Sequence, residues 1–217
     1  DDWLERRGPY LSLIGAIDDA TGKVPYALFR DEEDAQGYTL LLRHITGNQG
    51  IPEALYHDGH GIFERSRKEP ETLEEQLTGR RKPTQFGRMM EELGIISITS
   101  LSPQAKGRIE RLWGTFQDRL KSELRIAGAM NASEANLVLW DFLPRFNERF
   151  AVPAREPGLA YRPVPDGFKP EEVFCFKYER TVGKDNVVRF GEHRLQIVPT
   201  NGRSSYVKAK VEVHERM

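Results

Sequence analysis

The stretch that decides the fold is Ser102–Arg125, SPQAKGRIERLWGTFQDRLKSELR. Apolar residues recur in it every three or four positions, the spacing that places them on one face of an α-helix. At 100° per residue, Glu110 lies at one edge of this apolar stripe, beside Lys106, Gln117 and Lys121. The stretch therefore predicts a long helix with one carboxylate near its beginning, packed through a stripe made of Ile109, Leu112, Trp113, Phe116, Leu120 and Leu124.

The segments before this helix alternate between strand and helix patterns. Apolar runs at 10–17 and 23–30 flank the turn Asp18–Gly22 and predict a β-hairpin, and Trp3-Leu4 has the pattern of the end of an earlier strand. Acidic residues at 31–34 favour the start of a helix. The order indicates a mixed α/β layout, and its further elements are a helix ending at Gly47 or Gly50, a strand at 52–57, a helix at 84–93 and a strand at 95–98.

Three segments differ from this pattern in composition. Residues 64–83 are highly charged and predict a solvated insertion or flexible loop with a short helix at 72–77, and the triplet Arg80–Lys82 is able to contact phosphates. Residues 153–172 are rich in proline and predict an extended linker that follows a helix starting near 131. The remainder, 173–217, predicts a small all-β module resembling a barrel, with strands at 173–178, 186–190, 193–199 and 205–214.

The composition is that of a globular protein with a polar surface. Of the 217 residues, 38% are hydrophobic and 30% are charged. No apolar run approaches the roughly 18 residues that a membrane helix needs, so a membrane partner is not expected. The single cysteine, Cys175, lies in an apolar context and predicts a buried thiol in a reducing compartment. The net charge of −1 argues weakly against nucleic-acid binding, because local basic patches matter more for such binding than net charge does.

Two motifs carry a resemblance to a known family. Asp58-Gly59-His60-Gly61-Ile62-Phe63 is similar to the segment around the second acid of the DDE transposase and retroviral integrase superfamily. Ser102–Arg111, with Pro103, Gly107 and Glu110, is similar to its third motif. Residues 10–150 as a whole resemble the RNase H-like catalytic core of that superfamily, in the form found in bacterial insertion-sequence transposases.

The resemblance implies a domain organisation and a reaction. It implies an RNase H-like mixed sheet flanked by helices at 1–152, with 64–83 as an insertion, 153–172 as a linker and 173–217 as the β module. The reaction is metal-dependent cleavage of DNA, followed by strand transfer through direct transesterification. Two Mg²⁺ or Mn²⁺ ions catalyse such phosphoryl transfers, and they prefer carboxylate oxygens as ligands. Asp58 and Glu110 are therefore expected to be catalytic metal ligands.

Further expectations concern the partners. DNA, both transposon ends and target, is the expected partner, with Lys106, Arg108, Arg111, Arg119 and Lys121 contacting phosphates. A homo-oligomer on DNA and a cytoplasmic, nucleoid-associated location follow from the same resemblance. His57 and His60 flank the site and are interpreted as local structural groups or DNA contacts. The first acid of the family is expected ahead of residue 1, with Asp1 as the alternative within the chain.

Two other functions stay open on the sequence. One is an RNase H-like nuclease that cuts DNA without strand transfer. The other is a transposase-derived DNA-binding or assembly domain without catalysis, against which the presence of Asp58 and Glu110 argues. Basic residues of the last module, among them Arg189, Arg194, Arg203, Lys208 and Lys210, fit DNA binding, assembly or an ordinary solvated surface equally well.

Overall fold

The computed structural model describes residues 1–66, 68–99, 103–155, 158, 160–199, 202 and 204–217, and for 103–109 and 112 it describes the backbone. The chain forms two compact units, Asp1–Phe168 and Lys169–Met217. In the described part of the chain, no helix has the length and apolar content required to cross a membrane. Each unit is considered by itself below.

The predicted hairpin is present in the first unit. Strands β1 (Ser12–Ala16) and β2 (Tyr26–Arg30) pair antiparallel, with Ile14 opposite Leu28. The turn between them is organised by Asp18, whose carboxylate accepts hydrogen bonds from Ala20 N (3.0 Å) and Thr21 Oγ1 (2.7 Å). Asp18 is thus a turn-forming residue.

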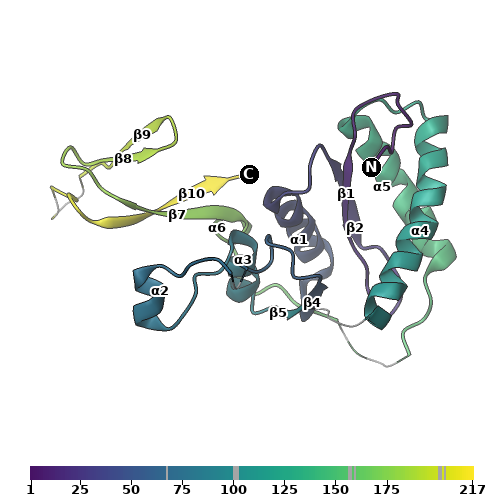
Figure 1. The fold of residues 1–217 in the computed structure, drawn as a ribbon, viewed down its shortest axis with the longest axis horizontal. Coiled ribbons are helices and arrows are strands. Elements are labelled where there is room, and N and C mark those ends of the chain that lie inside the picture. Colours follow the sequence, from purple (N-terminus) through teal and green to yellow (C-terminus); the bar gives the residue numbers. More distant parts are fainter. Residues whose placement is uncertain (67, 100–102, 156–157, 159, 200–201, 203) are drawn as a thin grey trace. The chain divides into compact units, whose positions relative to one another are not determined.

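Helices cover both faces of the hairpin, as Figure 1 shows. Ile14 and Leu28 pack against Leu41 and Ile45 of α1 (Ala35–Gln49) on one face. The opposite face, including Phe29, packs against α4 (Pro103–Ile126) and α5 (Ala132–Phe150). Successive side chains of a strand point to opposite faces, so the short hairpin is buried on both sides.

The predicted apolar stripe of α4 forms the main core, as far as its side chains are described. Phe116, Leu120 and Leu124 are buried. The Phe116 ring lies 5.3 Å from that of Phe142 and 4.9 Å from that of Phe146, both on α5, in edge-on geometry. Such contacts add to the burial of the rings. Ile109 and Leu112 belong to the stripe by spacing, and their side chains lie outside the described residues.

The outer edge of β2 is closed by side chains of α5. Asn136 accepts a hydrogen bond from Phe29 N (2.7 Å) and donates one to Phe29 O (3.0 Å). Asn147 makes the same pair of bonds with Val24, at 2.8 and 2.9 Å. Trp140 Nε1 donates to the carbonyl oxygen of Ala27. These side chains satisfy backbone groups that would otherwise need another strand.

A second pair of strands lies beyond α1 in the chain. Strands β4 (Ala54–His57) and β5 (Ile96–Thr99) pair in parallel, and β3 (Ile51–Pro52) pairs antiparallel with β6 (Tyr161–Arg162). Helix α3 (Gln85–Leu93) precedes β5, with Thr84 as its N-cap and Gly94 in the left-handed conformation at its end. The mixed α/β layout is confirmed, although the described strands form two-stranded sheets instead of one continuous sheet.

The prediction for Trp3-Leu4 was wrong. Both side chains are buried, but residues 3–6 form a turn instead of the end of a strand. Glu5 and Arg6 adopt positive φ angles of 50° and 64°, and the carboxylate of Asp2 accepts a hydrogen bond from Arg6 N. The carboxylate of Glu5 also binds the guanidinium of Arg125 at the end of α4. These polar contacts hold the backbone in a conformation that a strand cannot adopt.

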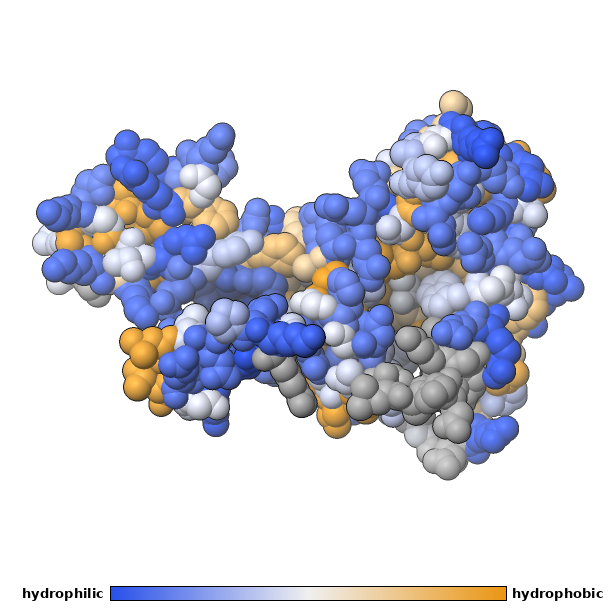
Figure 2. Space-filling model, in the orientation of Figure 1, coloured by the Kyte–Doolittle hydropathy of each residue, from blue (hydrophilic) through white to orange (hydrophobic). Residues whose placement is uncertain are grey.

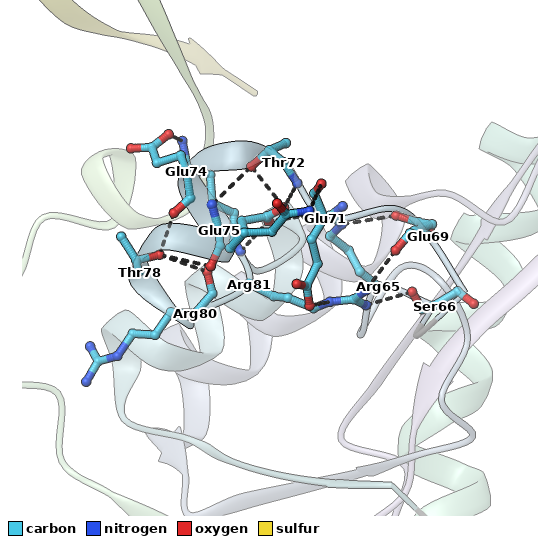
Figure 3. A network of polar contacts seen from close by, with 12 residues as sticks. Arg65, Ser66, Glu69, Glu71, Thr72, Glu74, Glu75, Thr78, Arg80 and Arg81 are labelled. Carbon is cyan, nitrogen blue, oxygen red and sulfur yellow. Dashed lines mark hydrogen bonds and ion pairs between the residues drawn. The ribbon is translucent and has the colours of Figure 1, made fainter.

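The charged segment 64–83 is organised around one buried carboxylate. It contains the expected short helix, α2 (Leu73–Thr78), whose N-cap Thr72 and N3 residue Glu75 form a capping box. Glu75 is only 2% exposed, accepts hydrogen bonds from Thr72 N and Lys82 N (both 2.8 Å), and pairs with Arg65 (Figure 3). The hydrogen bonds from Thr72 and Lys82 lower the pKa of Glu75 to about 2. Most other residues of the segment are exposed, as expected.

The second unit is built from short strands. After α6 (Pro170–Val173), β7 (Cys175–Thr181) pairs antiparallel with β10 (Lys210–Arg216), and β8 (Val187–Phe190) pairs with β9 (His193–Gln196). The thiol of Cys175 is buried, as predicted, and lies 3.4 Å from the carbonyl oxygen of Glu172. The described strands form two separate sheets, so the residues that are described do not close into a barrel.

Candidate functional site

Asp58 lies directly after β4, at the carboxyl end of the parallel pair. His57 is in register with Thr99, the last residue of β5, so both strands end side by side. Asp58 is exposed, and its Oδ1 accepts a hydrogen bond from His60 N at 3.0 Å. Gly59 follows with a φ of 76°, a value that glycine adopts without strain. The local turn therefore holds the carboxylate at the strand end and leaves it open to solvent.

The side chain of His57 stabilises the turn at Asp58 and Gly59. Its side chain is buried, and its Nδ1 accepts a hydrogen bond from Gly59 N at 3.1 Å. The ring proton must then reside on Nε2, which lies 2.7 Å from Ser97 Oγ on β5. Burial lowers the pKa of His57, and this favours the neutral ring. The interpretation of His57 as a local structural group is thus supported by its contacts.

Three further polar contacts fasten the loop 57–64. Thr99 Oγ1 donates a hydrogen bond to Glu64 Oε1 at 2.8 Å. Thr84 Oγ1 lies 2.7 Å from the carbonyl oxygen of Ile62 and 3.1 Å from that of Phe63. The loop is therefore tied to the end of β5 and to the start of α3. The bond between His57 and Ser97 and the bond between Thr99 and Glu64 together form what we call the strand-end clasp: His57, Glu64, Ser97 and Thr99.

Aromatic rings pack beneath the same loop. The Phe63 ring stacks on His57, with centroids 4.5 Å apart, and meets Tyr38 of α1 edge-on at 4.8 Å. It also contacts Phe86 of α3. Burial, together with the hydrogen bond from its hydroxyl to Glu33, raises the pKa of Tyr38. The loop that carries Asp58 thus rests on two helices as well as on β5.

Glu110 lies on α4, seven residues after the first residue of the helix, and is exposed. Strand β5 ends at Thr99, at the same end of the sheet as Asp58, and α4 begins at Pro103. Ligand sites of α/β proteins lie outside the carboxyl ends of parallel strands. Asp58 thus lies at such an end, and Glu110 lies on the helix that follows β5 along the chain.

The fit to a divalent metal rests on these two carboxylates. Both are exposed oxygen donors, the type that Mg²⁺ and Mn²⁺ prefer. Within the described part of the chain, however, no three His, Cys, Asp or Glu side chains are grouped closely enough to hold a metal ion. The donor chemistry fits a metal, while a complete set of ligands is not assembled by the described residues.

The five predicted phosphate contacts are distributed around α4. Arg111 and Arg119 are exposed, whereas Lys106 and Arg108 have side chains outside the described residues. The ammonium of Lys121 lies 5.7 Å from the centre of the Trp3 ring, in a cation–π contact. Arg119 lies over the ring of Phe150, 5.2 Å from its centre. The contacts of Arg119 and Lys121 with aromatic rings were not foreseen from the sequence.

The basic triplet Arg80–Lys82 is partly used inside the charged segment. Arg81 donates hydrogen bonds to Glu71 and to the carbonyl oxygens of Ser66 and Glu69. Lys82 pairs with Glu74 at 2.9 Å. The guanidinium of Arg80 points away from this network, as Figure 3 shows. Of the triplet, Arg80 is the member whose position suits a contact with a phosphate.

The basic residues of the second unit are largely exposed. Arg194 pairs with Asp185, and Lys210 pairs with Glu179. Arg189 and Lys208 are exposed, and Arg203 lies outside the described residues. Ion pairs of this exposed kind are typical of an ordinary solvated surface.

Comparison with known proteins gives two long matches. The chain is 36% identical over 216 residues to "Putative transposase y4bF" of Sinorhizobium fredii, covering 98% of this chain and 45% of that protein. It is 31% identical over 197 residues to "Transposase for insertion sequence IS1202" of Streptococcus pneumoniae, covering 91% of this chain and 41% of that protein. This chain is homologous to insertion-sequence transposases.

The homology to these transposases extends over both units of the chain. No protein-family model matches it. The chain spans less than half the length of the two relatives. The two motifs predicted a resemblance to transposases, and the similarity to transposases extends along nearly the whole chain.

Sequence reasoning missed two groups of residues in the first unit. The first is Ser97, Thr99 and Glu64 of the strand-end clasp, whose contacts join positions far apart in the chain. The second is Arg145, Arg149 and Phe150 of α5, which lie close to Arg119. An Arg-rich end of the α5 segment was the available signal for the second group.

Proposed function

We propose that this chain is the catalytic core of a DDE-type DNA transposase, in which Asp58 and Glu110 bind Mg²⁺ or Mn²⁺ and DNA is the substrate. Homology to insertion-sequence transposases over nearly the whole chain supports a role in transposition. The observation that carries the assignment of residues is the parallel register of His57 with Thr99. It supports the assignment because Asp58 directly follows His57, and Thr99 is the last residue of the strand that precedes the helix of Glu110.

The residues around Asp58 have a positioning role in this proposal. His57 holds Gly59 through its Nδ1, and Asp58 itself accepts a hydrogen bond from His60 N. The exposed part of the Asp58 carboxylate is then oriented before any ligand arrives. A pair of bound divalent ions supplies activation of the attacking oxygen and stabilisation of the leaving oxygen.

The first acid of the family motif has two candidate origins in the proposal. One is a segment ahead of residue 1, and the other is Asp1 itself. Asp1 and Leu11 exchange two backbone hydrogen bonds, at 3.0 and 3.2 Å, in the antiparallel manner. A strand leading into Asp1 would therefore run along the edge of β1 that faces away from β2. We propose an RNase H-like sheet completed in this way.

Binding of Mn²⁺ to the 217-residue chain tests the proposed metal ligands. Asp58→Asn and Glu110→Gln should each weaken binding about tenfold or more, because even outer-shell changes at metal sites have effects of that size. If both carboxylates hold the same ions, the double variant should lose less than the sum of the two single losses. Asp118→Asn, an exposed acid of the same helix, is the control. Equal effects for the control, or strictly additive losses, would contradict the proposal.

The reaction is tested separately from metal binding. Residues 1–217 can replace the aligned segment of the S. pneumoniae relative, and the chimera can be assayed for cleavage and joining of DNA ends. Joining that is abolished by Asp58→Asn supports the transposase proposal. Cleavage without joining would favour a nuclease, and DNA binding that proceeds without either reaction would favour an assembly domain.

A further inference from the structure

Helices α4 and α5 enclose a groove with a volume of about 460 Å³. Three guanidinium groups line it, together with the ring of Phe150 and two carboxylates. The arginines are Arg119 on α4 and Arg145 and Arg149 on α5, and the acids are Asp118 and Glu123. Such a concentration of arginine in one groove favours an anionic ligand, because each guanidinium offers several N–H donors in a fixed plane.

Two of these arginines are held in place by an aromatic ring instead of by a carboxylate. Arg119 lies 5.2 Å and Arg149 lies 5.7 Å from the centre of the Phe150 ring. Over the residues that the structure describes, neither guanidinium is within ion-pair distance of an acid. A cation–π contact occupies the face of a guanidinium and leaves its edge, with the N–H donors, available. The Phe150 end of the groove therefore presents two oriented donor groups.

Arg145 behaves differently and organises the rest of the groove. Its Nη2 lies 3.2 Å from Glu123 and 3.0 Å from Asp141, and these acids balance its charge. Glu123 is thus paired with Arg145. Of the two acids that line the groove, this leaves the charge of Asp118 to offset the charges of Arg119 and Arg149. The positive charge is concentrated at the end of the groove where Phe150 lies.

The groove is on the opposite flank of α4 from the candidate metal ligand. Nine residues separate Arg119 from Glu110, and nine steps of 100° amount to half a turn of rotation about the helix axis. Lys121, eleven residues from Glu110, returns to the same edge as that acid. Arg119 therefore cannot serve the DNA segment that Lys121 and Glu110 face, although the sequence grouped these residues together.

We infer that the groove between α4 and α5 is a second phosphate site, in which Arg119 and Arg149 bind the backbone of duplex DNA away from Asp58 and Glu110. The inference rests on the proposed function for its choice of DNA as the ligand. Guanidinium groups bind phosphate oxygens through paired, charge-assisted hydrogen bonds, and such contacts carry no sequence preference. An acidic protein segment is the competing ligand, and the experiment distinguishes the two.

The test is the salt dependence of DNA binding by the 217-residue chain. Fluorescence anisotropy of a labelled duplex of arbitrary sequence gives the slope of log K against log salt concentration. Each phosphate contact contributes about 0.9 to that slope, so Arg119→Gln combined with Arg149→Gln should reduce it by about two. Arg149→Lys keeps the charge and should retain most of the slope while weakening binding. Arg43→Gln, an exposed arginine of α1, should leave both unchanged.

The outcomes separate this inference from the proposed function. A double variant with the slope of the parent chain overturns the groove site, even if Asp58→Asn and Glu110→Gln still lose Mn²⁺. A reduced slope with unchanged Mn²⁺ binding supports it. A chain that does not bind duplex DNA, or a double variant that loses only self-association, also overturns it and favours an acidic protein segment. Thermal melting of both variants checks that they fold. If the double variant does not fold, the affinity and salt slope of the Arg149→Lys variant decide the test.

Discussion

The hairpin β1–β2 and the parallel pair β4–β5 have the same number of strands but opposite surroundings. The hairpin is covered by helices on both faces, and α5 bonds to its outer edge through Asn136 and Asn147. The parallel pair exposes Tyr56 and Ile96, by 58% and 60% of their surfaces, and carries its polar groups at one end. One pair of strands serves as a frame, and the other presents the candidate site.

The difference shows how a small domain separates stability from site geometry. Burial of apolar surface, at roughly 25 cal/mol per Å², stabilises the frame without regard to direction. The strand-end clasp instead uses short, directional contacts, such as His57 to Ser97 at 2.7 Å and Thr99 to Glu64 at 2.8 Å. We therefore expect variants of the frame to change folding, and variants of the clasp to change binding.

The largest effect is expected in the frame. Phe116 is fully buried between α4 and α5, so Phe116→Ala should reduce the free energy of unfolding by about 3–5 kcal/mol. Urea denaturation followed by circular dichroism measures this change. Leu137→Ala, at an exposed position of α5, is the matched control and should have little effect. A loss below about 1 kcal/mol for Phe116→Ala would mean that this core does not hold the frame.

A smaller effect is expected at the edge of β2. Asn136→Ala leaves the N–H and C=O groups of Phe29 without their side-chain partner, which should cost about 1–3 kcal/mol. Asn48→Ala removes an exposed amide on α1 and provides the comparison in the same denaturation experiment. If both variants are equally stable, closure of this edge by α5 does not contribute to the frame.

The charged segment should show a local effect that depends on pH. The pKa of Glu75 is lowered to about 2 in the folded chain from an ordinary value of 4.5. Its contribution to stability is therefore complete above about pH 4.5 and is lost as the pH falls toward 2. Amide hydrogen exchange in α2 should accelerate across this range. Glu75→Gln should make the exchange fast at neutral pH and nearly independent of pH, whereas Glu74→Gln should behave like the parent chain.

The smallest effect on folding is expected at the strand-end clasp. Ser97→Ala removes the partner of His57 Nε2 and should cost at most about 1 kcal/mol, since Ser97 is exposed. The same substitution should weaken Mn²⁺ binding about tenfold, because outer-shell partners orient metal ligands. Ser122→Ala on α4 is the control for loss of an exposed hydroxyl. If Ser97→Ala binds Mn²⁺ as well as the parent chain does, the strand-end clasp does not contribute to metal binding.

Much of the frame could be predicted from the sequence because its patterns are periodic. The apolar runs at 10–17 and 23–30, on either side of the turn Asp18–Gly22, predicted the hairpin, and the spacing of Phe116, Leu120 and Leu124 predicted the buried face of α4. The helix predicted at 84–93 corresponds to α3, Gln85–Leu93. Local rules suffice for such elements, since each signal lies within one segment.

The polar contacts around the site could not be predicted in the same way. The bond between Ser97 and His57 joins residues 40 positions apart, and the Asn147 side chain reaches Val24 across 123 positions. Glu75 is buried because Thr72 and Lys82, on either side of α2, both donate hydrogen bonds to its carboxylate. The sequence of this segment indicated its high charge but not these contacts. The turn at residues 3–6 likewise depends on Arg125 at the far end of α4. Contacts of this kind follow from the assembled fold.

Gly15 of β1 lies against the side chain of Trp113 on α4. A Cβ atom added there would lie 2.6 Å from Cη2 of Trp113, so the indole sits where a side chain would otherwise be. Trp113 follows Glu110 by three residues on the same helix, and a side chain at position 15 would require the Trp113 ring to shift. Displacements of about 1 Å can cost a catalytic site a hundredfold. Gly15 thus leaves room for the indole of Trp113, and we expect Gly15→Ala to disturb the helix that carries the proposed metal ligand Glu110.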